Sequence, residues 1–114
     1  MATDTATVEW MVKQLSGAGS VSAKKMFGEY GLYLEEKMVA LVCDNRFFVK
    51  RTEAGYAYWG EHEEDFPYPG AKPLLVLDED GMRDKNKLAE LMRLTYEELP
   101  APKKKSAKKV AGLG

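Results

Sequence analysis

Cysteine and histidine are nearly absent from this chain, with Cys43 and His62 as the single residues of their types among 114. One cysteine excludes an internal disulfide, and a zinc site built from several cysteines is excluded as well. We expect Cys43 to be a buried apolar thiol, the alternative being a reactive or intermolecular one. A Ser/His or Cys/His nucleophile would depend on His62, and no G-x-S-x-G motif supports such a site. We therefore expect no catalytic residues, metal or cofactor.

Long apolar runs are absent too. No stretch approaches the roughly 18 to 20 residues that span a bilayer. The start, MATDTATVEW, has neither the basic nor the apolar segment of an export signal, so we expect a cytoplasmic protein. The hydrophobic fraction of 45% and charged fraction of 31% are typical of a soluble globular protein, and the length suits one self-contained core.

The net charge of −1 is unevenly distributed along the chain. Residues 1–100 hold 12 of the 17 lysines and arginines and all 18 acidic residues, a net charge of −6, whereas residues 101–114 hold five lysines and no acid. The tail, with the sequence KKKSAKKVAGLG after Pro102, is too polar and short to form a core. We predict a domain over residues 1–100 followed by a flexible lysine-rich tail over 101–114.

The tail is a candidate nucleic-acid contact, because several lysines can neutralise phosphates and give weak, salt-sensitive and sequence-independent binding. It contains no aromatic residue on which a base could stack. A solubilising or proteolytically labile terminus is the alternative. The residues concerned are Lys103, Lys104, Lys105, Lys108 and Lys109.

Hydrophobic periodicity predicts a two-layer α+β fold. Apolar residues at helical spacing predict a helix over residues 5–16, with Asp4 or Thr5 as its cap. The period then changes, and we predict strands near 22–27, 30–34, 37–43 and 46–50, a helix over 52–60, a strand near 74–78 and a helix over 84–99. The order α-β-β-β-β-α-β-α favours a mainly antiparallel five-stranded sheet packed with about three helices.

Two short turns set the predicted strand registers. Asp44-Asn45 suits a two-residue hairpin because both residue types tolerate positive φ, and Glu35-Glu36 is the preceding turn. The later hairpin then pairs Cys43 with Arg46, Val42 with Phe47, Leu41 with Phe48, and Ala40 with Val49. The earlier one pairs Leu34 with Lys37, Tyr33 with Met38, and Leu32 with Val39. Side-chain alternation gives a core face of Tyr33, Met38, Ala40, Val42, Phe47 and Val49.

The opposite face of this predicted sheet is also apolar, whereas a solvated face would alternate with polar residues more cleanly. We expect another layer or a partner to cover it, since contiguous exposed apolar surface marks interfaces. The predicted interface, for a homodimer or another protein, consists of Tyr30, Leu32, Val39, Leu41 and Phe48.

Several ligand-binding motifs are matched only in part. The G-x-x-G of Gly28 and Gly31 has the spacing of a backbone clamp, but it lies between strands and encloses an acid, so glycines that permit a bend and close packing fit better. GAGSVSAKK lacks the third glycine of G-x-G-x-x-G, where Ser22 stands, and the Gly-Lys pair of a P-loop, since Ala23 precedes Lys24. DEDGMRDKNK suggests a calcium loop, but aligning Gly81 with the loop glycine puts Val76 at the first ligand position and Lys87 where the bidentate glutamate should be, so we expect an exposed turn. EHEEDF offers one histidine and is expected to be a solvated acidic loop.

The stretch KKMFGEYGLYLEEKMVALVCDNRFFVK resembles the TfoX N-terminal domain family, whose members typically read Met-Phe-Gly-Gly-Tyr-Gly before an aliphatic residue, an aromatic residue and a hairpin. The matching signature residues are Met26, Phe27, Gly28, Tyr30 and Gly31. The likeness extends through DFPYPGAKPLLVLDED to the last helix, over roughly residues 8–99.

This resemblance implies an α+β domain linked to the regulation of natural competence, without established catalytic residues. The best-known members are positive regulators that act beside a cyclic-AMP-responsive activator. Glu29 departs from the family's usual glycine, and the lysine tail stands where full-length regulators have a second, DNA-associated domain. The sequence thus predicts a non-enzymatic interaction module that acts through protein contacts, with a nucleic-acid-binding accessory protein as the alternative.

Overall fold

The computed structural model describes residues 3–26 and 29–101. Its helices are α1 (Thr5–Leu15), the short 3₁₀ helix η1 (Ser16–Ala18), α2 (Glu53–Trp59), α3 (Glu79–Arg83) and α4 (Lys85–Glu98). The strands are β1 (Val21–Met26), β2 (Glu29–Leu34), β3 (Lys37–Cys43), β4 (Arg46–Val49), β5 (Glu63–Asp65) and β6 (Leu74–Leu77). The predicted α+β class is confirmed.

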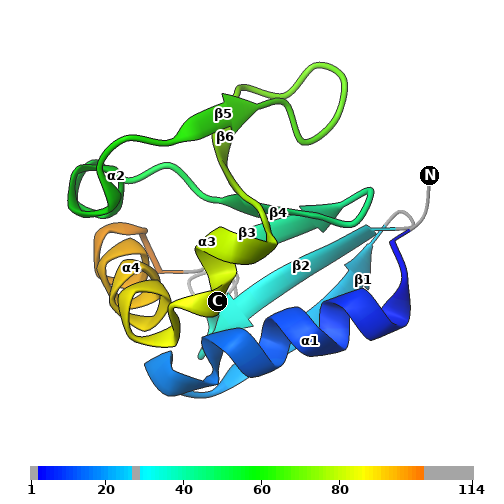
Figure 1. The fold of residues 1–114 in the computed structure, drawn as a ribbon, viewed down its shortest axis with the longest axis horizontal. Helices are drawn as coiled ribbons and strands as arrows, with labels where there is room; N and C mark the ends of the chain where they lie inside the picture. Colours follow the sequence, from blue (N-terminus) through cyan, green and yellow to red (C-terminus); the bar gives the residue numbers. More distant parts are fainter. Residues whose placement is uncertain (1–2, 27–28, 102–114) are drawn as a thin grey trace, which may run out of the picture.

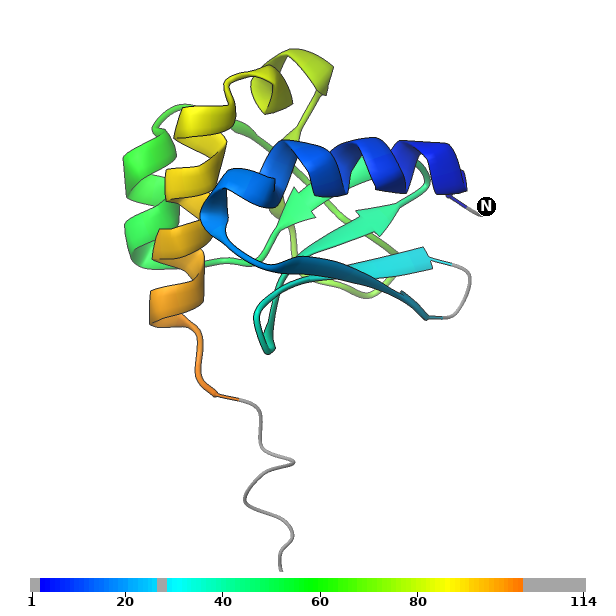
Figure 2. The same ribbon diagram turned by 90° about the horizontal axis from the view of Figure 1, so that it is seen from below.

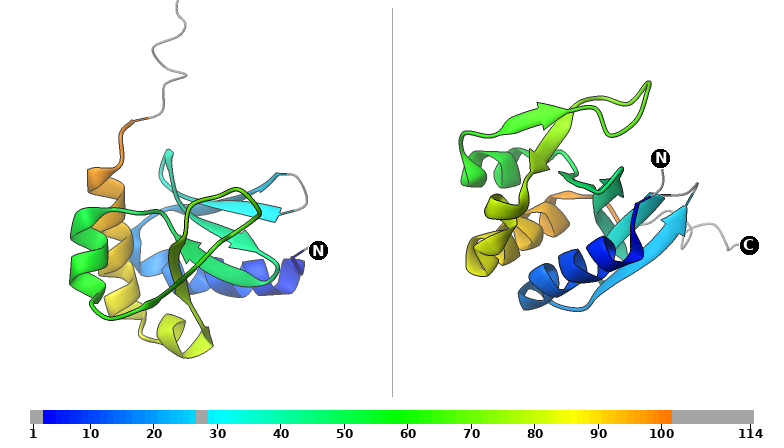
Figure 3. Two further views of the ribbon diagram at one scale, coloured as in Figure 1. Left: turned by 90° about the horizontal axis from the view of Figure 1, so that it is seen from above. Right: turned by 45° about the vertical axis from the view of Figure 1, so that its right-hand side comes forward.

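The described strands form one antiparallel sheet in the order β1-β2-β3-β4-β6-β5 (Figure 1). Helices α1 and α4 lie on the same side of it, and we call that side the inner face and the opposite side the outer face (Figure 2). The N-terminal end of α1 lies far from α4, and the described chain leaves the fold after the C-terminal end of α4 (Figure 3). No helix in the described part of the chain is long and apolar enough to cross a membrane.

The hydrophobic core lies between the inner face and the helices. Helix α1 contributes Val8, Met11 and Leu15, because these residues recur on one side of the helix. Helix α4 contributes its own apolar stripe, and the strands contribute the side chains that alternate inward. The contributions of α4 and the sheet are Leu88, Leu91, Met92, Leu32, Leu34, Val39, Ala40, Val42, Phe47, Val49, Leu75 and Leu77.

Besides the short 3₁₀ helix η1, two elements were not predicted from the sequence. The acidic run expected to be a loop contains β5, in which Glu63, Glu64 and Asp65 pair with β6. Acidic side chains disfavour strands, so the free edge of β6 rather than local propensity accounts for this pairing. The expected turn after Leu77 contains α3, whose first turn is capped by Asp78: the carboxylate accepts a hydrogen bond from the amide of Gly81 at 2.8 Å. The carboxylate of Asp84 caps α4 in the same way by accepting a hydrogen bond from the amide of Lys87. The predicted start of this helix at residue 84 is confirmed.

The hairpin between β3 and β4 has the predicted register. Asp44 and Asn45 both adopt positive φ, 55° and 63°, which matches the right-handed twist of the flanking strands. All four predicted residue pairs across this hairpin are present. The predicted cap of α1 is correct in position only: Asp4 is the N-cap residue, but its side chain makes no capping hydrogen bond.

The predicted faces of β2 and the start of β3 are wrong, because the pairing shifts by one residue between Leu32 and Tyr33. Leu32 pairs with Ala40 instead of Val39, although the Tyr33–Met38 and Leu34–Lys37 pairs are as predicted. One extra residue reverses the side-chain alternation beyond it. Tyr33 and Met38, expected in the core, are therefore half-buried on the outer face, and the side chains of Tyr30, Leu32 and Val39 pack in the core.

Candidate binding cleft

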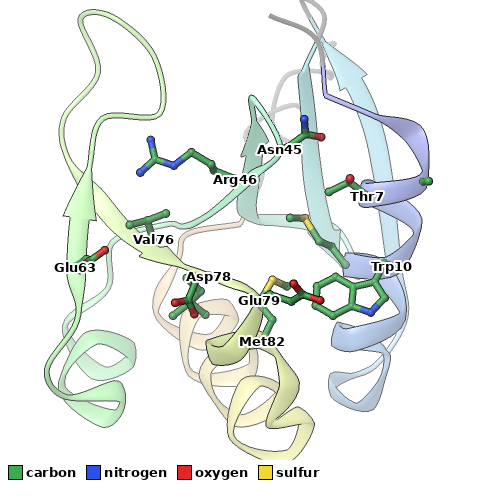
Figure 4. A pocket seen from close by; sticks show the side chains of 12 residues that line it. Thr7, Trp10, Asn45, Arg46, Glu63, Val76, Asp78, Glu79 and Met82 are labelled. Carbon is green, nitrogen blue, oxygen red and sulfur yellow. The ribbon is translucent and has the colours of Figure 1, made fainter.

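A cleft of about 660 Å³ opens between α1, the β3–β4 turn, and the junction of β6 with α3 (Figure 4). It exists because β4 and β6 pair only over three residues, the last pair being Phe47 with Leu77. Beyond that pair the chain enters the β3–β4 turn on one side and α3 on the other. The lining residues are Ala6, Thr7, Trp10, Met11, Asn45, Arg46, Glu63, Val76, Leu77, Asp78, Glu79 and Met82.

The floor of the cleft is apolar and firmly held. Met11, Leu77 and Met82 line it, with exposed fractions of 4%, 7% and 1%. The side-chain amide of Gln14 donates a buried hydrogen bond of 2.6 Å to the carbonyl of Met82, which fixes α3 against α1. A buried amide would lose much of its hydration without such a partner, so this bond disfavours any movement that separates the two helices.

The rim of the cleft is acidic. Glu63, Asp78 and Glu79 approach from β5 and from the start of α3, and these belong to the acidic runs at residues 61–65 and 78–80. The cationic lining residue, Arg46, donates to Asp65 with 2.9 Å between Nη2 and Oδ2. That hydrogen bond lowers the pKa of Asp65. On the rim itself, Glu79 pairs with Arg83 at 3.4 Å and the carboxylate of Asp78 accepts from the amide of Gly81. One arginine against three carboxylates leaves the rim with a net negative charge.

One wall of the cleft is aromatic. Trp10 is half-buried on α1, and Figure 4 shows its indole reaching into the cleft from α1 while Glu79 reaches in from α3. An indole face attracts cations, and carboxylates beside it attract them as well. Together with the apolar floor, this arrangement suits a chain segment that carries both cationic and apolar side chains.

The N-terminal end of the cleft is fastened by Glu29. Its carboxylate accepts hydrogen bonds from the hydroxyl of Thr3 and, at 3.1 Å, from the amide of Asp44. The amide of Asn45 donates to the Thr3 hydroxyl at 3.1 Å, and the Asn45 side chain accepts from the amide of Asp4 at 2.9 Å. These bonds hold the start of α1 against the β3–β4 turn, and a glycine at position 29 would supply none of the side-chain contacts.

His62 takes part in a cluster outside the cleft that is satisfied by the chain itself. Its ring nitrogens lie 2.6 Å from the carbonyl of Gly60 and 3.0 Å from a carboxylate oxygen of Glu64. The hydrogen bond with His62 lowers the pKa of Glu64, which also pairs with Arg51 at 2.9 Å. The described residues contain no group of three or more potential ligands that could hold a metal ion. We interpret this cluster as a structural clamp on β5.

The described part of the sequence signature has a structural role at Gly31. A Cβ at this position would lie 3.2 Å from the terminal methyl groups of Met26 and Met38, so the glycine permits close packing of these side chains over β2. Close packing was one part of the predicted role of Gly31; the predicted bend is not seen at this residue, which lies inside β2. Tyr30 packs against the core from the same strand. Phe27 and Gly28 lie outside the described residues.

The model of the TfoX N-terminal domain matches residues 13–99 of this chain. The chain belongs to the TfoX N-terminal domain family. It is also similar to an uncharacterized 12.7 kDa protein in the trpE 5′ region of Spirochaeta aurantia, with 42% identity over 108 residues that cover 95% of this chain and 93% of the relative. The resemblance recognised from the sequence is thereby confirmed.

In this TfoX N-terminal domain the five residues predicted as an interface do not share an exposed face. Leu32 and Val39 are fully buried in the core because of the register shift, and Phe48 on the outer face is 1% exposed. Leu41 alone combines the predicted outer orientation with partial exposure. Association through the outer face remains a prediction, and it now depends on Leu41 together with Tyr33 and Met38.

The loop between β5 and β6 adjoins Phe48 on the outer face. A hollow of about 550 Å³ is lined there by Phe48, Cys43 and residues 66–70. Cys43 is buried, as predicted, and burial raises the pKa of its thiol. The five lysines of the tail lie outside the described residues, so their contact with nucleic acid also remains a prediction.

The cleft was not predicted from the sequence. Its acidic rim was visible only as two runs, which were interpreted separately as a solvated loop and an exposed turn. Trp10 lies between the core residues Val8 and Met11 on α1, so its place in the sequence did not distinguish it from residues of the core. No local pattern in the sequence indicates that residues 10, 63 and 79 line the same cleft, because strand pairing and helix packing bring them there.

Proposed function

We propose that this TfoX N-terminal domain is a non-enzymatic, cytoplasmic interaction module that binds a basic segment of a partner protein in the cleft. The observation that carries this proposal is the combination of an apolar floor at Met11 and Met82 with an acidic rim at Glu63 and Glu79. Apolar contacts provide affinity, and charge complementarity selects the partner and its orientation. A partner of this kind fits the family's link to regulation.

The remaining chemistry of the domain supports binding rather than catalysis. Both ring nitrogens of His62 are hydrogen-bonded to Gly60 and Glu64. The thiol of Cys43 is buried and its pKa is raised, which disfavours the nucleophilic thiolate. The cleft contains neither residue.

Calorimetric titration with two short peptides tests the proposal. One peptide alternates lysine with leucine, and the other alternates glutamate with leucine. We expect the lysine peptide to bind and its affinity to fall with added salt, because exposed charges are screened. Equal binding of the glutamate peptide would contradict the proposal, since hydrophobic adsorption alone would then account for the signal.

A charge reversal at the rim locates the binding site. Glu63→Lys is expected to weaken binding of the lysine peptide by roughly fivefold, the effect of about 1 kcal/mol at an exposed position. Glu97→Lys makes the same charge change on the exposed side of α4, away from the cleft lining, and is expected to leave the affinity within about twofold. Similar losses in both variants would show that only the net charge matters and would refute the cleft as the site.

A further inference from the structure

The C-terminal segment of this chain has the composition that the cleft selects. Residues 103–113 contain five lysines, no acid, and two larger apolar residues, Val110 and Leu113. The cleft has carboxylates on its rim and methionine side chains on its floor. We propose that residues 103–113 occupy the cleft of the same molecule, an inference that rests on the proposed function and names the first segment that the cleft binds.

The charges of the two parts are complementary. The acidic residues flanking the cleft belong to β5 and the start of α3, two segments that the antiparallel pairing of β5 with β6 places next to each other. A single exposed ion pair contributes only about 0–1 kcal/mol. More than one lysine is therefore needed for a stable contact, and the segment carries two adjacent ones, Lys108 and Lys109, beyond the stretch that spans the distance to the cleft.

The order of residues along the segment also fits. Its lysines precede Val110 and Leu113, so basic side chains can meet the rim while the apolar end reaches the floor at Met11 and Met82. A lysine next to Trp10 gains cation–π attraction of about 0.5–1 kcal/mol. The domain already makes such a contact at Trp59, where Nζ of Lys87 lies 4.2 Å from the ring centroid.

The segment is long enough to reach the cleft of its own molecule. The cleft is lined in part by residues of α3, which directly precedes α4. The described chain leaves at the opposite, C-terminal end of α4 (Figure 2). A helix of 14 residues is about 21 Å long. Six or seven extended residues cover that distance at about 3.3–3.6 Å each. Lys108, Lys109 and the apolar end of the segment remain available to enter the cleft.

Attachment to the same chain favours this occupant over a free segment. A short tether gives an effective concentration on the order of millimolar, so even a weak contact is populated. A partner segment then has to displace residues 103–113, and its apparent affinity is reduced by the occupied fraction. Removal of the segment is accordingly expected to increase the affinity of the cleft for the lysine peptide.

Quenching of Trp10 fluorescence by acrylamide tests the occupancy, in a Trp59→Phe background that leaves Trp10 as the sole tryptophan. The comparison is between the full chain and a chain ending at Ala101, which retains every residue of the core. We expect the full chain to be quenched less by roughly twofold at low ionic strength. The difference should vanish near 1 M salt, where the Debye length is about 3 Å.

Charge variants provide the matched control. Lys108→Glu with Lys109→Glu should raise the quenching of the full chain to that of the shortened one. Lys24→Glu with Lys72→Glu makes the same change in net charge at exposed positions outside the cleft and should not. Equal quenching of the full and shortened chains at low salt would overturn the inference.

Two further measurements separate this inference from the proposed function. If a synthetic peptide of residues 101–114 protects Trp10 of the shortened chain while the full chain shows no protection, the cleft binds basic segments but not its own. If the peptide gives no protection either, both proposals fail. Protection that grows with protein concentration, together with a dimer in light scattering, would assign the segment to a second copy and overturn the intramolecular contact.

Discussion

Tyr56 links the two strands whose separation forms the cleft, and its hydroxyl can be removed with little change of shape. The hydroxyl donates to the carbonyl of Val49 on β4 at 2.6 Å and accepts from the amide of Leu75 on β6 at 2.8 Å. The residue is 9% exposed, and its ring packs in the core. Tyr56→Phe keeps the ring and leaves one buried amide and one buried carbonyl without this partner.

Each buried polar group that loses its partner costs about 1–3 kcal/mol, so we expect the loss of two partners in Tyr56→Phe to lower the free energy of unfolding by about 2–6 kcal/mol. The Tm should fall by roughly 10–30 °C for a domain of this size. In urea the midpoint should decrease while the slope stays constant, since the folded surface is unchanged. Tyr58→Phe is the control, because Tyr58 is 43% exposed and its hydroxyl makes no hydrogen bond within the described residues.

The pH dependence of Tyr56 gives a second readout. Burial raises the pKa of the Tyr56 hydroxyl in the folded state. Its contribution to stability is therefore complete below the unfolded pKa near 10 and is lost as the pH rises above it. The phenylalanine variant should lose less stability in that range. A change of less than about 0.5 kcal/mol at neutral pH, equal to that of Tyr58→Phe, would refute the assignment of the two hydrogen bonds.

Three other outcomes are expected. Lys37→Met should destabilise the domain by about 1–3 kcal/mol in thermal unfolding, because the ammonium donates at 2.8 and 2.7 Å to two carbonyls at the end of α4, and Lys50→Met should have little effect. Glu64→Gln should reduce the loss of stability during acid titration below pH of about 4.3, since the hydrogen bond with His62 lowers the pKa of Glu64 and that stability is present above the unfolded pKa. Cys43 should react slowly with a disulfide reagent near pH 8 and rapidly in urea; rapid reaction of the folded chain would contradict its burial and raised pKa.

The parts of the fold predicted from sequence were those governed by local chemistry. Apolar residues at helical spacing located α1 and α4, and two residues tolerant of positive φ, Asp44 and Asn45, set the register of β3 with β4. In each case the deciding interaction lies within a few residues along the chain. At these positions the local sequence preference agrees with the final fold, so a short stretch of sequence is enough to predict the structure.

The errors arose where distant segments decided the local structure. The register shift near Leu32 moved Tyr33 out of the core and Val39 into it, and alternation along each strand gave no sign of the extra residue. The strand β5 forms on the free edge of β6 from residues whose own preference is for a loop. For both, pairing with another strand outweighed local propensity.

By itself the sequence determined the family, the α+β class and the opposite charges of the domain and its C-terminal segment. These follow from composition, periodicity and a contiguous motif, which need no knowledge of long-range contacts. The tertiary structure alone decided that Glu63, Asp78 and Glu79, from two separate acidic runs, line one cleft together with Trp10 and an apolar floor. That arrangement depends on where β4 and β6 stop pairing and on how α3 packs against α1, and such long-range geometry is not encoded in any single stretch of the chain.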